Sequence, residues 1–337
     1  MKAFRWTCVL AAAAFGLAAA PATAQETTLI FATTNNPQAH LNVRVHHPWA
    51  QRINEAGKGV VRIDVRDGPT LANHTNYYSR VVDDVVQIAW GIHSFVPGKF
   101  PLTDVATLPY EVEKAADGSV ALWRLLQAGA LGAEYKDIVP LYICTLPQNS
   151  LHMAKPIKAI DDLSGLKVIS GAKVGTEIIT RLGGNPVSLP ITGIYEAVQR
   201  GTADGFIVPW TGFQPFKLAE VSAFHVDTLW AGSSGLVFMS KKRYDALPAA
   251  ARKVIDDNSG EAQSKLFGAF WDSVQDEGRN MVKGMDKHTV VTYDPAQDKA
   301  IRDKIAPVTE AWVKATPGAE PVLKQFRETL AKVKSGS

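Results

Sequence analysis

The stretch DDLSGLKVISGAKVGTEIITRLGGNPVSLPITGIYEAVQRGTADGFIVPW, residues 161–210, decides the fold. It contains three short apolar runs that favour β-strands, at 166–170, 187–189 and 206–208. Between them the apolar residues follow helical spacing, and Gly183-Gly184 and Gly201 end the two helical segments. Thr192 is a predicted N-cap of the second helix, because its hydroxyl can accept a hydrogen bond from a free backbone amide. Strands that alternate with helices in this order predict an α/β fold with a parallel sheet.

The carboxyl ends of these strands are where a small ligand is expected to bind. In this stretch the first strand ends at Ser170-Gly171, and the last ends at Pro209-Trp210. These residues are therefore the first candidates for a binding site.

The same stretch resembles a known protein family. The segments LSGLKV, GTE, LGGNPVSLP and IYEAVQRGTADGFIVP follow one another at the spacing of the solute-binding proteins of tripartite ATP-independent periplasmic (TRAP) transporters, the DctP-like family. The resemblance implies a two-lobed fold of the periplasmic-binding-protein kind, with a long helix that spans both lobes. It also implies that the protein captures a small organic solute by closing its lobes and delivers the solute to the TRAP permease subunits in the membrane.

The N-terminus, residues 1–24, predicts a secretory signal peptide and hence a periplasmic protein. Lys2 and Arg5 precede an apolar segment, and Ala22-Thr23-Ala24 gives a small-x-small cleavage pattern. The remaining chain has 34 basic and 33 acidic residues, so we expect neither nucleic acid nor an anionic membrane surface as a partner. It keeps one cysteine, Cys144, which we expect to be buried and which excludes an intrachain disulfide.

About 313 mature residues exceed what one core usually supports, so two lobes are expected. The predicted division is lobe I at 25–147, completed by about 236–262, and lobe II at 148–235, completed by about 263–337. A helical pattern from Pro248 to about Lys287, softly broken near Ser259-Gly260, is the candidate for the long helix that the resemblance implies.

Two polar positions of the resembled family carry aliphatic residues in this chain. The family has an arginine one place after its GLK-I segment, where the side chain holds a ligand carboxylate through a bidentate ion pair. Here Ile169 stands at that position, and Ile207 stands where the family has an acid after V-D-G-x. We therefore expect a ligand that is larger or less polar than a C4 dicarboxylate, such as an aromatic acid.

Aromatic residues at predicted strand ends are candidate apolar walls for such a ligand. Trp90, Trp210 and Trp230 fit this role, and each fits an ordinary core position equally well. Phe206 lies inside a strand, which favours packing in the core over ligand contact.

A ligand carboxylate needs a partner in place of the missing arginine. Gly171 and Lys173 open the helix after the first strand, where free backbone amides bind anions. Arg44 and Arg80 of lobe I are other possible anchors. Each of these three cations also fits the alternative of a solvent-facing side chain on a helix.

The other candidates for ligand binding are polar residues at predicted strand ends: Asn35, Asn36, His93, Gln148, Asn149 and Ser170. Asn35 and Asn36 fit equally well as turn residues that cap their own backbone. His93 also fits a structural histidine, and we retain it because it follows a strand that carries Trp90.

No motif in the sequence indicates an enzyme, a cofactor or a metal site. The sequence lacks G-x-S-x-G, a Walker loop and G-x-G-x-x-G after a strand. The histidines show no HxxxH or HxxE spacing. We therefore expect a binding protein without cofactor or metal.

The combined prediction is a periplasmic solute-binding protein with hinges near Thr145–Asn149 and Ala231–Leu236. A ligand that touches both lobes would stabilise the closed form through contacts that the open form lacks. Two alternatives stay open: a ligand-sensing subunit for a membrane receptor, and a secreted enzyme on the same fold. The first differs from a transport protein only in its membrane partner, which sequence does not reveal.

Overall fold

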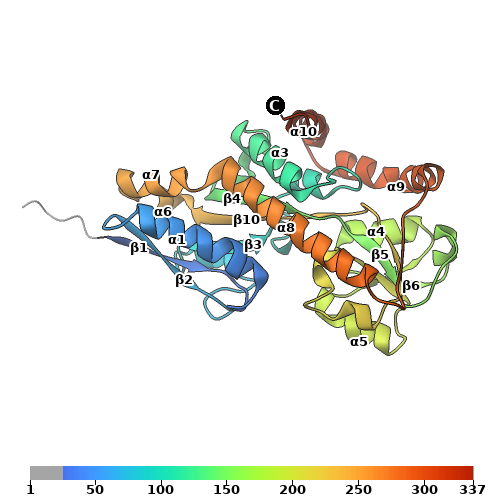
Figure 1. Cartoon of the computed structure of the whole chain (residues 1–337). Helices are drawn as coiled ribbons and strands as arrows, with labels where there is room; N and C mark the ends of the chain where they lie inside the picture. Colours follow the sequence, from blue (N-terminus) through green and yellow to red (C-terminus); the bar gives the residue numbers. More distant parts are fainter. Residues whose placement is uncertain (1–25, 337) are drawn as a thin grey trace, which may run out of the picture.

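The computed structural model describes residues 26–336, which form two lobes, each built around its own β-sheet (Figure 1). The sheet of lobe I has five strands and the sheet of lobe II has six. The two-lobed α/β architecture predicted from the sequence is confirmed. The predicted signal peptide, residues 1–24, lies outside the described residues.

The sheet of lobe I has the strand order β2-β1-β3-β10-β4, and only β10 runs antiparallel to its neighbours. These strands are β1 (Thr27–Ala32), β2 (Val61–Arg66), β3 (Ile88–Ile92), β4 (Ile138–Leu146) and β10 (Ser233–Ser240). Strand β10 comes from the later part of the chain and lies between two earlier strands, so the segment that completes the sheet of lobe I follows lobe II in the sequence.

Helices cover both faces of this sheet, as apolar residues on both sides of a mostly parallel sheet require. One face packs against α1 (His47–Ala56), α7 (Ala249–Asp257) and the first half of α8 (Gly260–Lys283). The other face packs against α2 (Tyr77–Val82), α3 (Ala115–Gln127) and α10 (Ala319–Lys334). The short helix α6 (Lys241–Asp245) follows β10.

The sheet of lobe II has the strand order β11-β9-β5-β8-β6-β7. Its strands are β5 (Ser150–Met153), β6 (Lys167–Ser170), β7 (Asn185–Ser188), β8 (Gly205–Val208), β9 (Phe224–Val226) and β11 (Thr289–Val291). Strands β6, β7 and β8 come from the stretch 161–210 and pair in parallel, as predicted. Strand β5 pairs antiparallel to both β8 and β9.

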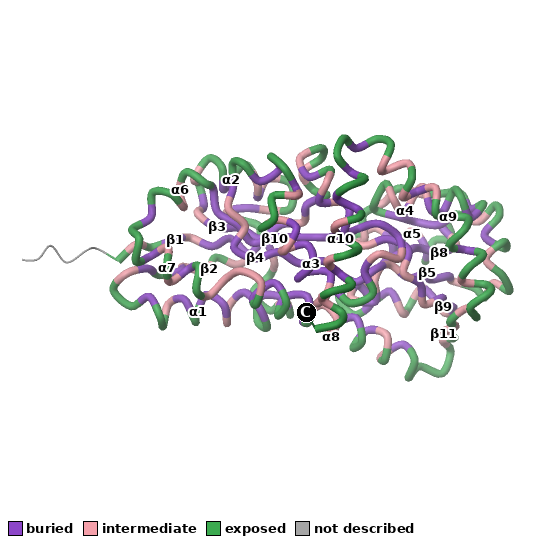
Figure 2. The backbone as a smooth tube through the Cα atoms, turned by 90° about the horizontal axis from the view of Figure 1, so that it is seen from above, coloured by how far each residue is buried: buried purple, intermediate pink, exposed green. Residues whose placement is uncertain are grey.

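Two hydrophobic clusters pack on opposite faces of this second sheet. One contains residues of α4 (Lys173–Arg181) and of the first half of α9 (Pro295–Ala315). The other contains residues of α5 (Ile194–Gln199), the turn Trp210–Gly212 and the end of α8. Figure 2 shows the result: buried backbone follows the strands of both lobes, and exposed backbone follows the outer helices.

Helix α8 is the long helix that joins the lobes (Figure 1). Phe267 and Phe270 of its first half belong to the core of lobe I, and Val282 near its end belongs to the core of lobe II. The predicted break before it lies at Gly260, which has a positive φ of 80°. Cys144 is fully buried in the lobe I core on which this helix packs, as predicted.

Two crossing segments connect the lobes and bring their sheet edges together. Strand β4 leaves lobe I at Leu146, and β5 begins at Ser150, which pairs with Val208 at the carboxyl end of β8. Because β4 runs parallel to β1 and β3, the chain passes from the carboxyl edge of one sheet to the carboxyl edge of the other. The second segment, residues 227–232, returns to β10. The two carboxyl edges therefore face each other.

Some local predictions differ from the structure. Thr192 does not cap a helix: it lies in the short turn Ile191–Gly193, and α5 begins only at Ile194 without a side-chain cap. The predicted helix over 76–86 is shorter, because the chain leaves helical geometry at Asp84, which has a positive φ of 58°. Helix α10 packs on α3 of lobe I, although the predicted division placed the chain after about residue 263 in lobe II.

Candidate functional site

Thr34 lies at the carboxyl end of β1, where lobe I faces lobe II. Its φ of 62° places a β-branched residue in the left-handed region, which such residues rarely adopt. Its side chain is buried, and among residues 26–336 the Oγ1 hydroxyl has no hydrogen-bond partner. Strained residues with unused polar groups concentrate at ligand sites. Sequence reasoning selected the neighbouring Asn35 and Asn36 and missed Thr34.

Asn35 and Asn36 form the turn that follows β1. The Asn35 amide donates to the Thr33 carbonyl at 3.1 Å, and the backbone carbonyls of both asparagines accept from Asn42 Nδ2, each at 3.1 Å. The Asn35 side chain therefore acts as a turn residue, while Asn36 is exposed at the edge of lobe I.

Asn42 fixes this turn and was not predicted. Its Nδ2 also donates to Thr33 Oγ1 at 2.9 Å and to Asp67 Oδ1 at 2.8 Å. His47 Nε2 lies 2.9 Å from the other oxygen of Asp67. Asn42 is completely buried, so this web ties the turns after β1 and β2 into one rigid edge. The only signal for Asn42 in the sequence was its place beside the apolar Leu41 at the start of the predicted helix.

His93 and Trp90 lie inside lobe I. His93 Nδ1 lies 3.0 Å from Ser234 Oγ, and Nε2 lies 3.0 Å from Tyr135 Oη, so both ring nitrogens are occupied. Burial lowers the pKa of His93 to about 3, which keeps the ring neutral. Trp90 packs against the rings of His46 and Phe267 and is almost fully buried. Both residues therefore belong to the buried interior of lobe I next to the carboxyl end of β3.

Gln148 and Asn149 belong to the first crossing segment. Gln148 is buried, and its side chain donates to the Leu108 carbonyl at 2.8 Å and accepts from the Tyr110 amide at 3.0 Å. Gln148 therefore anchors the crossing segment to a loop of lobe I. Asn149 bonds through its backbone to the second crossing segment, from its amide to the Ala231 carbonyl at 2.7 Å. Its side chain is partly exposed between the lobes.

Trp230 and Trp210 are both fully buried near the crossing segments. Trp230 packs in the lobe II cluster on the α4 and α9 side of the sheet. Trp210 lies directly after β8, donates from Nε1 to Asp227 Oδ1 at 3.1 Å, and packs its ring against His152 at 4.7 Å between centroids. Asp227 begins the second crossing segment and pairs with Arg279 of α8 at 3.0 Å. Trp210 thus links β8, the hinge and the long helix.

Ser170, Gly171 and Lys173 lie together at the carboxyl end of β6. Ser170 Oγ accepts from the Ala172 amide at 3.2 Å, which shapes the turn into α4. Gly171 and Lys173 are exposed, and no ion pair with another residue of 26–336 holds the Lys173 ammonium. The N-terminus of α4, which has no side-chain cap and carries the exposed Lys173, suits an anion.

Ile169 lies one residue before this turn and is completely buried. Strand pairing places its side chain in one row with Val187, Phe206 and His152 across the sheet. The row is covered by the apolar cluster that also contains Trp210. Ile207 points to the opposite face and is buried in the other cluster. The position at which sequence reasoning noted the missing arginine is thus filled by hydrocarbon.

The structure therefore separates the predicted residues into two groups. One group reaches the facing edges of the sheets: Asn35, Asn36, Asn149, Ser170, Gly171, Lys173. The other lies beneath those edges or at the hinge: Trp90, His93, Gln148, Trp210, Trp230.

Within residues 26–336 no helix is long and apolar enough to span a membrane.

Comparison with known proteins identifies this architecture. The bacterial extracellular solute-binding protein family 7, DctP, matches residues 31–315. The outer membrane transporter protein TsaT of Comamonas testosteroni is 29% identical over 298 residues, which cover 86% of this chain and 87% of that protein.

Solved structures agree. A TRAP solute-binding protein of Rhodoferax ferrireducens, crystallised with copurified benzoate, is 28% identical and covers 92% of this chain and 99% of its own, with a TM-score of 0.83. A marine metagenome TRAP solute-binding protein crystallised with 3-hydroxybenzoate is 25% identical and covers 92% and 99%, with a TM-score of 0.82. The two facing sheet edges, the bridging helix and these matches together show that the chain belongs to the DctP family of bacterial extracellular solute-binding proteins.

Proposed function

We propose that this protein captures a small aromatic carboxylate between the facing edges of its two sheets. The observation that carries the proposal is the apolar row at Ile169 and Phe206, which puts hydrocarbon where the resembled family has the guanidinium that holds a ligand carboxylate. The benzoate bound to the similar Rhodoferax protein supports the same ligand class. A benzoate-like ligand combines one anionic group with a flat apolar surface, which fits a mostly apolar site with few polar groups.

In this proposal the carboxylate binds at the N-terminus of α4. Gly171 allows close approach of the ligand to the backbone, and Lys173 supplies the charge. Thr34 of lobe I supplies a hydroxyl from the opposite edge. A ligand held in this way touches both lobes, so its binding energy favours the closed form.

The moving units in this proposal are lobe I, residues 25–147 with about 236–262, and lobe II, residues 148–235 with the chain from about 263. Because the first half of α8 packs in the core of lobe I and α10 packs on α3, we assign the first half of α8 and α10 to lobe I. The hinges are the crossing segments near Thr145–Asn149 and Ala231–Leu236.

We further propose that the protein acts in the periplasm after removal of residues 1–24 and hands its ligand to TRAP permease subunits. Membership of the DctP family supports both statements.

A thermal-shift screen tests the ligand class, since a ligand that binds only the folded state raises its melting temperature. Benzoate and 3-hydroxybenzoate should raise the melting temperature more than succinate and malate do. A larger shift with the dicarboxylates would contradict the proposal.

A further inference from the structure

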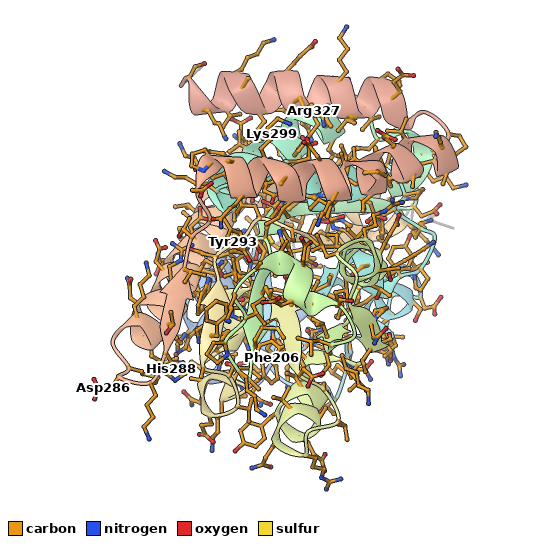
Figure 3. All side chains as sticks on the ribbon, turned by 90° about the vertical axis from the view of Figure 1, so that its right-hand side faces the viewer. Phe206, Asp286, His288, Tyr293, Lys299 and Arg327 are labelled. Carbon is orange, nitrogen blue, oxygen red and sulfur yellow. The ribbon has the colours of Figure 1, made fainter. Side chains whose placement is uncertain are left out.

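Three histidines of lobe II form a continuous chain of hydrogen bonds. His152 Nδ1 lies 3.0 Å from His225 Nδ1, and His225 Nε2 lies 3.0 Å from His288 Nδ1. The rings of His225 and His288 are stacked, with an angle of 7° between their planes. His152 and His225 are completely buried, whereas His288 is partly exposed. Figure 3 shows His288 at the edge of lobe II and Phe206, which packs on His152, further inside.

The inner end of the chain fixes the direction of every hydrogen bond in it. His152 Nε2 lies 3.1 Å from the Val208 carbonyl, which can only accept, so Nε2 carries the proton. In a neutral His152 ring, Nδ1 is then an acceptor, and His225 must donate from its own Nδ1. By the same argument His225 Nε2 accepts, and His288 must donate from Nδ1. Burial lowers the pKa of His152 and of His225, which keeps both rings neutral.

The chain of histidine hydrogen bonds ends at the edge of lobe II that faces the proposed ligand. Val208 is the last residue of β8, and the Val208 carbonyl precedes Pro209 and Trp210. The Trp210 ring rests on His152 and on His225, with centroid distances of 4.7 and 5.2 Å. If His152 lost its Nε2 proton, two lone pairs would face each other at Val208, and the strand end with Trp210 would shift.

We infer that His288, His225 and His152 are positioning residues, which hold the end of β8 and the Trp210 ring in the geometry that ligand binding needs. The inference rests on the proposed function, because it concerns the affinity for an aromatic acid. His288 lies at the outer end of this row of hydrogen bonds, so it acts on Val208 and Trp210 only through the rings of His225 and His152.

A matched pair of substitutions separates the direction of the hydrogen bond from the shape of the side chain. His288→Asn places an amide near the position of Nδ1, and the amide nitrogen can donate to His225. His288→Asp has the same shape and can only accept. It forces a neutral His225 to donate from Nε2, which leaves Nδ1 of His225 and Nδ1 of His152 without a proton between them. Thr289→Asp, at the exposed neighbouring residue, controls for the added charge.

Titration with benzoate should give the same Kd for the wild type, His288→Asn and Thr289→Asp, within about twofold. For His288→Asp we expect Kd to rise about fivefold, the loss that one hydrogen bond represents. Equal Kd values for His288→Asn and His288→Asp would overturn the inference. If the wild type binds no aromatic acid, the proposed function fails. The positions of the protons on the three histidine rings then test the direction of the hydrogen bonds separately.

Nitrogen-15 NMR of labelled histidine reads those protons without any substitution. The wild type should show the Nε2–H tautomer for His152 and the Nδ1–H tautomer for His225 and His288. Saturating benzoate should shift the nitrogen signals of all three rings. The opposite tautomer at His225, or a His288 signal that does not respond to bound benzoate, would contradict the positioning role.

Discussion

Thr34 shows how one residue can be costly for folding and useful for binding. A left-handed conformation costs a β-branched residue roughly 1–2 kcal/mol, and the buried Oγ1 recovers none of it through a hydrogen bond within residues 26–336. The conformation persists because Asn42 and Asp67 fix the turn on either side of Thr33. A function for the hydroxyl is the physical reason to retain such a residue.

Thr34→Gly should therefore stabilise the protein and weaken ligand binding. Glycine adopts this conformation without steric strain, so we expect the free energy of unfolding in urea to rise by about 0.5–1 kcal/mol. The affinity for benzoate should fall, because the hydroxyl is lost. Lys217→Gly is the matched control for the backbone effect: Lys217 also has a positive φ, 54°, but its side chain is exposed. Lower stability of Thr34→Gly, or unchanged affinity, would contradict the account.

Lys173 carries the charge in the proposed site. Lys173→Ala should weaken benzoate binding by about tenfold and leave the binding of neutral benzamide unchanged, because only the anion gains from the ammonium group. Lys167→Ala, at the other end of β6, is the control for overall charge. Calorimetric titration measures both ligands, and an equal loss for benzoate and benzamide would rule out a charge-specific role.

Sequence reasoning located strand-end residues such as Ser170 and Lys173, because local spacing determines where a strand stops. It missed Asn42 and Thr34, whose roles depend on contacts with Asp67 and on a backbone angle. It also missed the histidine chain. His152 and His225 are 73 residues apart, and His225 and His288 are 63 residues apart, so no local spacing signals that their rings meet.

Among the elements, α8 decides how lobe II is held against lobe I. Gly278 allows this helix to approach the turn after β8, since a Cβ atom there would lie 2.3 Å from the Trp210 carbonyl oxygen. Gln275, one turn earlier, accepts from the Thr211 amide at 3.3 Å. The sequence predicted the helix from its period, but it did not indicate which glycine makes a close contact.

Gly278→Ala should destabilise the protein by about 1–3 kcal/mol, because the added methyl group forces the helix away from the backbone of Trp210. The affinity for benzoate should fall as well, since Trp210 would move with the end of β8. Gly284→Ala, just after the helix, is the control, because a Cβ atom there has only ordinary contacts at 3.6 Å. Urea denaturation of both variants measures the difference, and equal stability would refute the close contact.

At the scale of the whole molecule, buried neutral histidines make stability depend on pH. Burial lowers the pKa of His46, His93 and His225 to about 3 each and also lowers the pKa of His152 well below its ordinary value. Below their ordinary pKa of 6.5 the unfolded chain binds protons that the folded chain does not. Stability is therefore complete above pH 6.5 and is lost as the pH falls. Three carboxyl groups act in the opposite direction, because burial raises the pKa of Asp104 to about 6 and also raises the pKa of Glu134 and of Asp272.

We expect the free energy of unfolding at pH 5 to be at least about 3 kcal/mol below its value at pH 7, since each buried histidine contributes up to about 1.4 kcal/mol per pH unit. Urea denaturation at the two pH values measures this difference. Equal stabilities would show that these rings accept protons in the folded state.

The two-lobed architecture followed from the sequence, because alternating strands and helices and a chain of this length leave few other arrangements. Which late elements complete each lobe did not follow, since the first half of α9 packs on lobe II, whereas the end of α9 and α10 pack on lobe I. The facing of the two carboxyl edges depends on strand order, which local patterns do not encode.

Small-angle X-ray scattering with and without ligand tests the central claim most directly, namely that an aromatic acid binds between the lobes and closes them. The account predicts a smaller radius of gyration with saturating benzoate and no change with succinate. An unchanged radius with benzoate bound, or compaction by succinate alone, would contradict it.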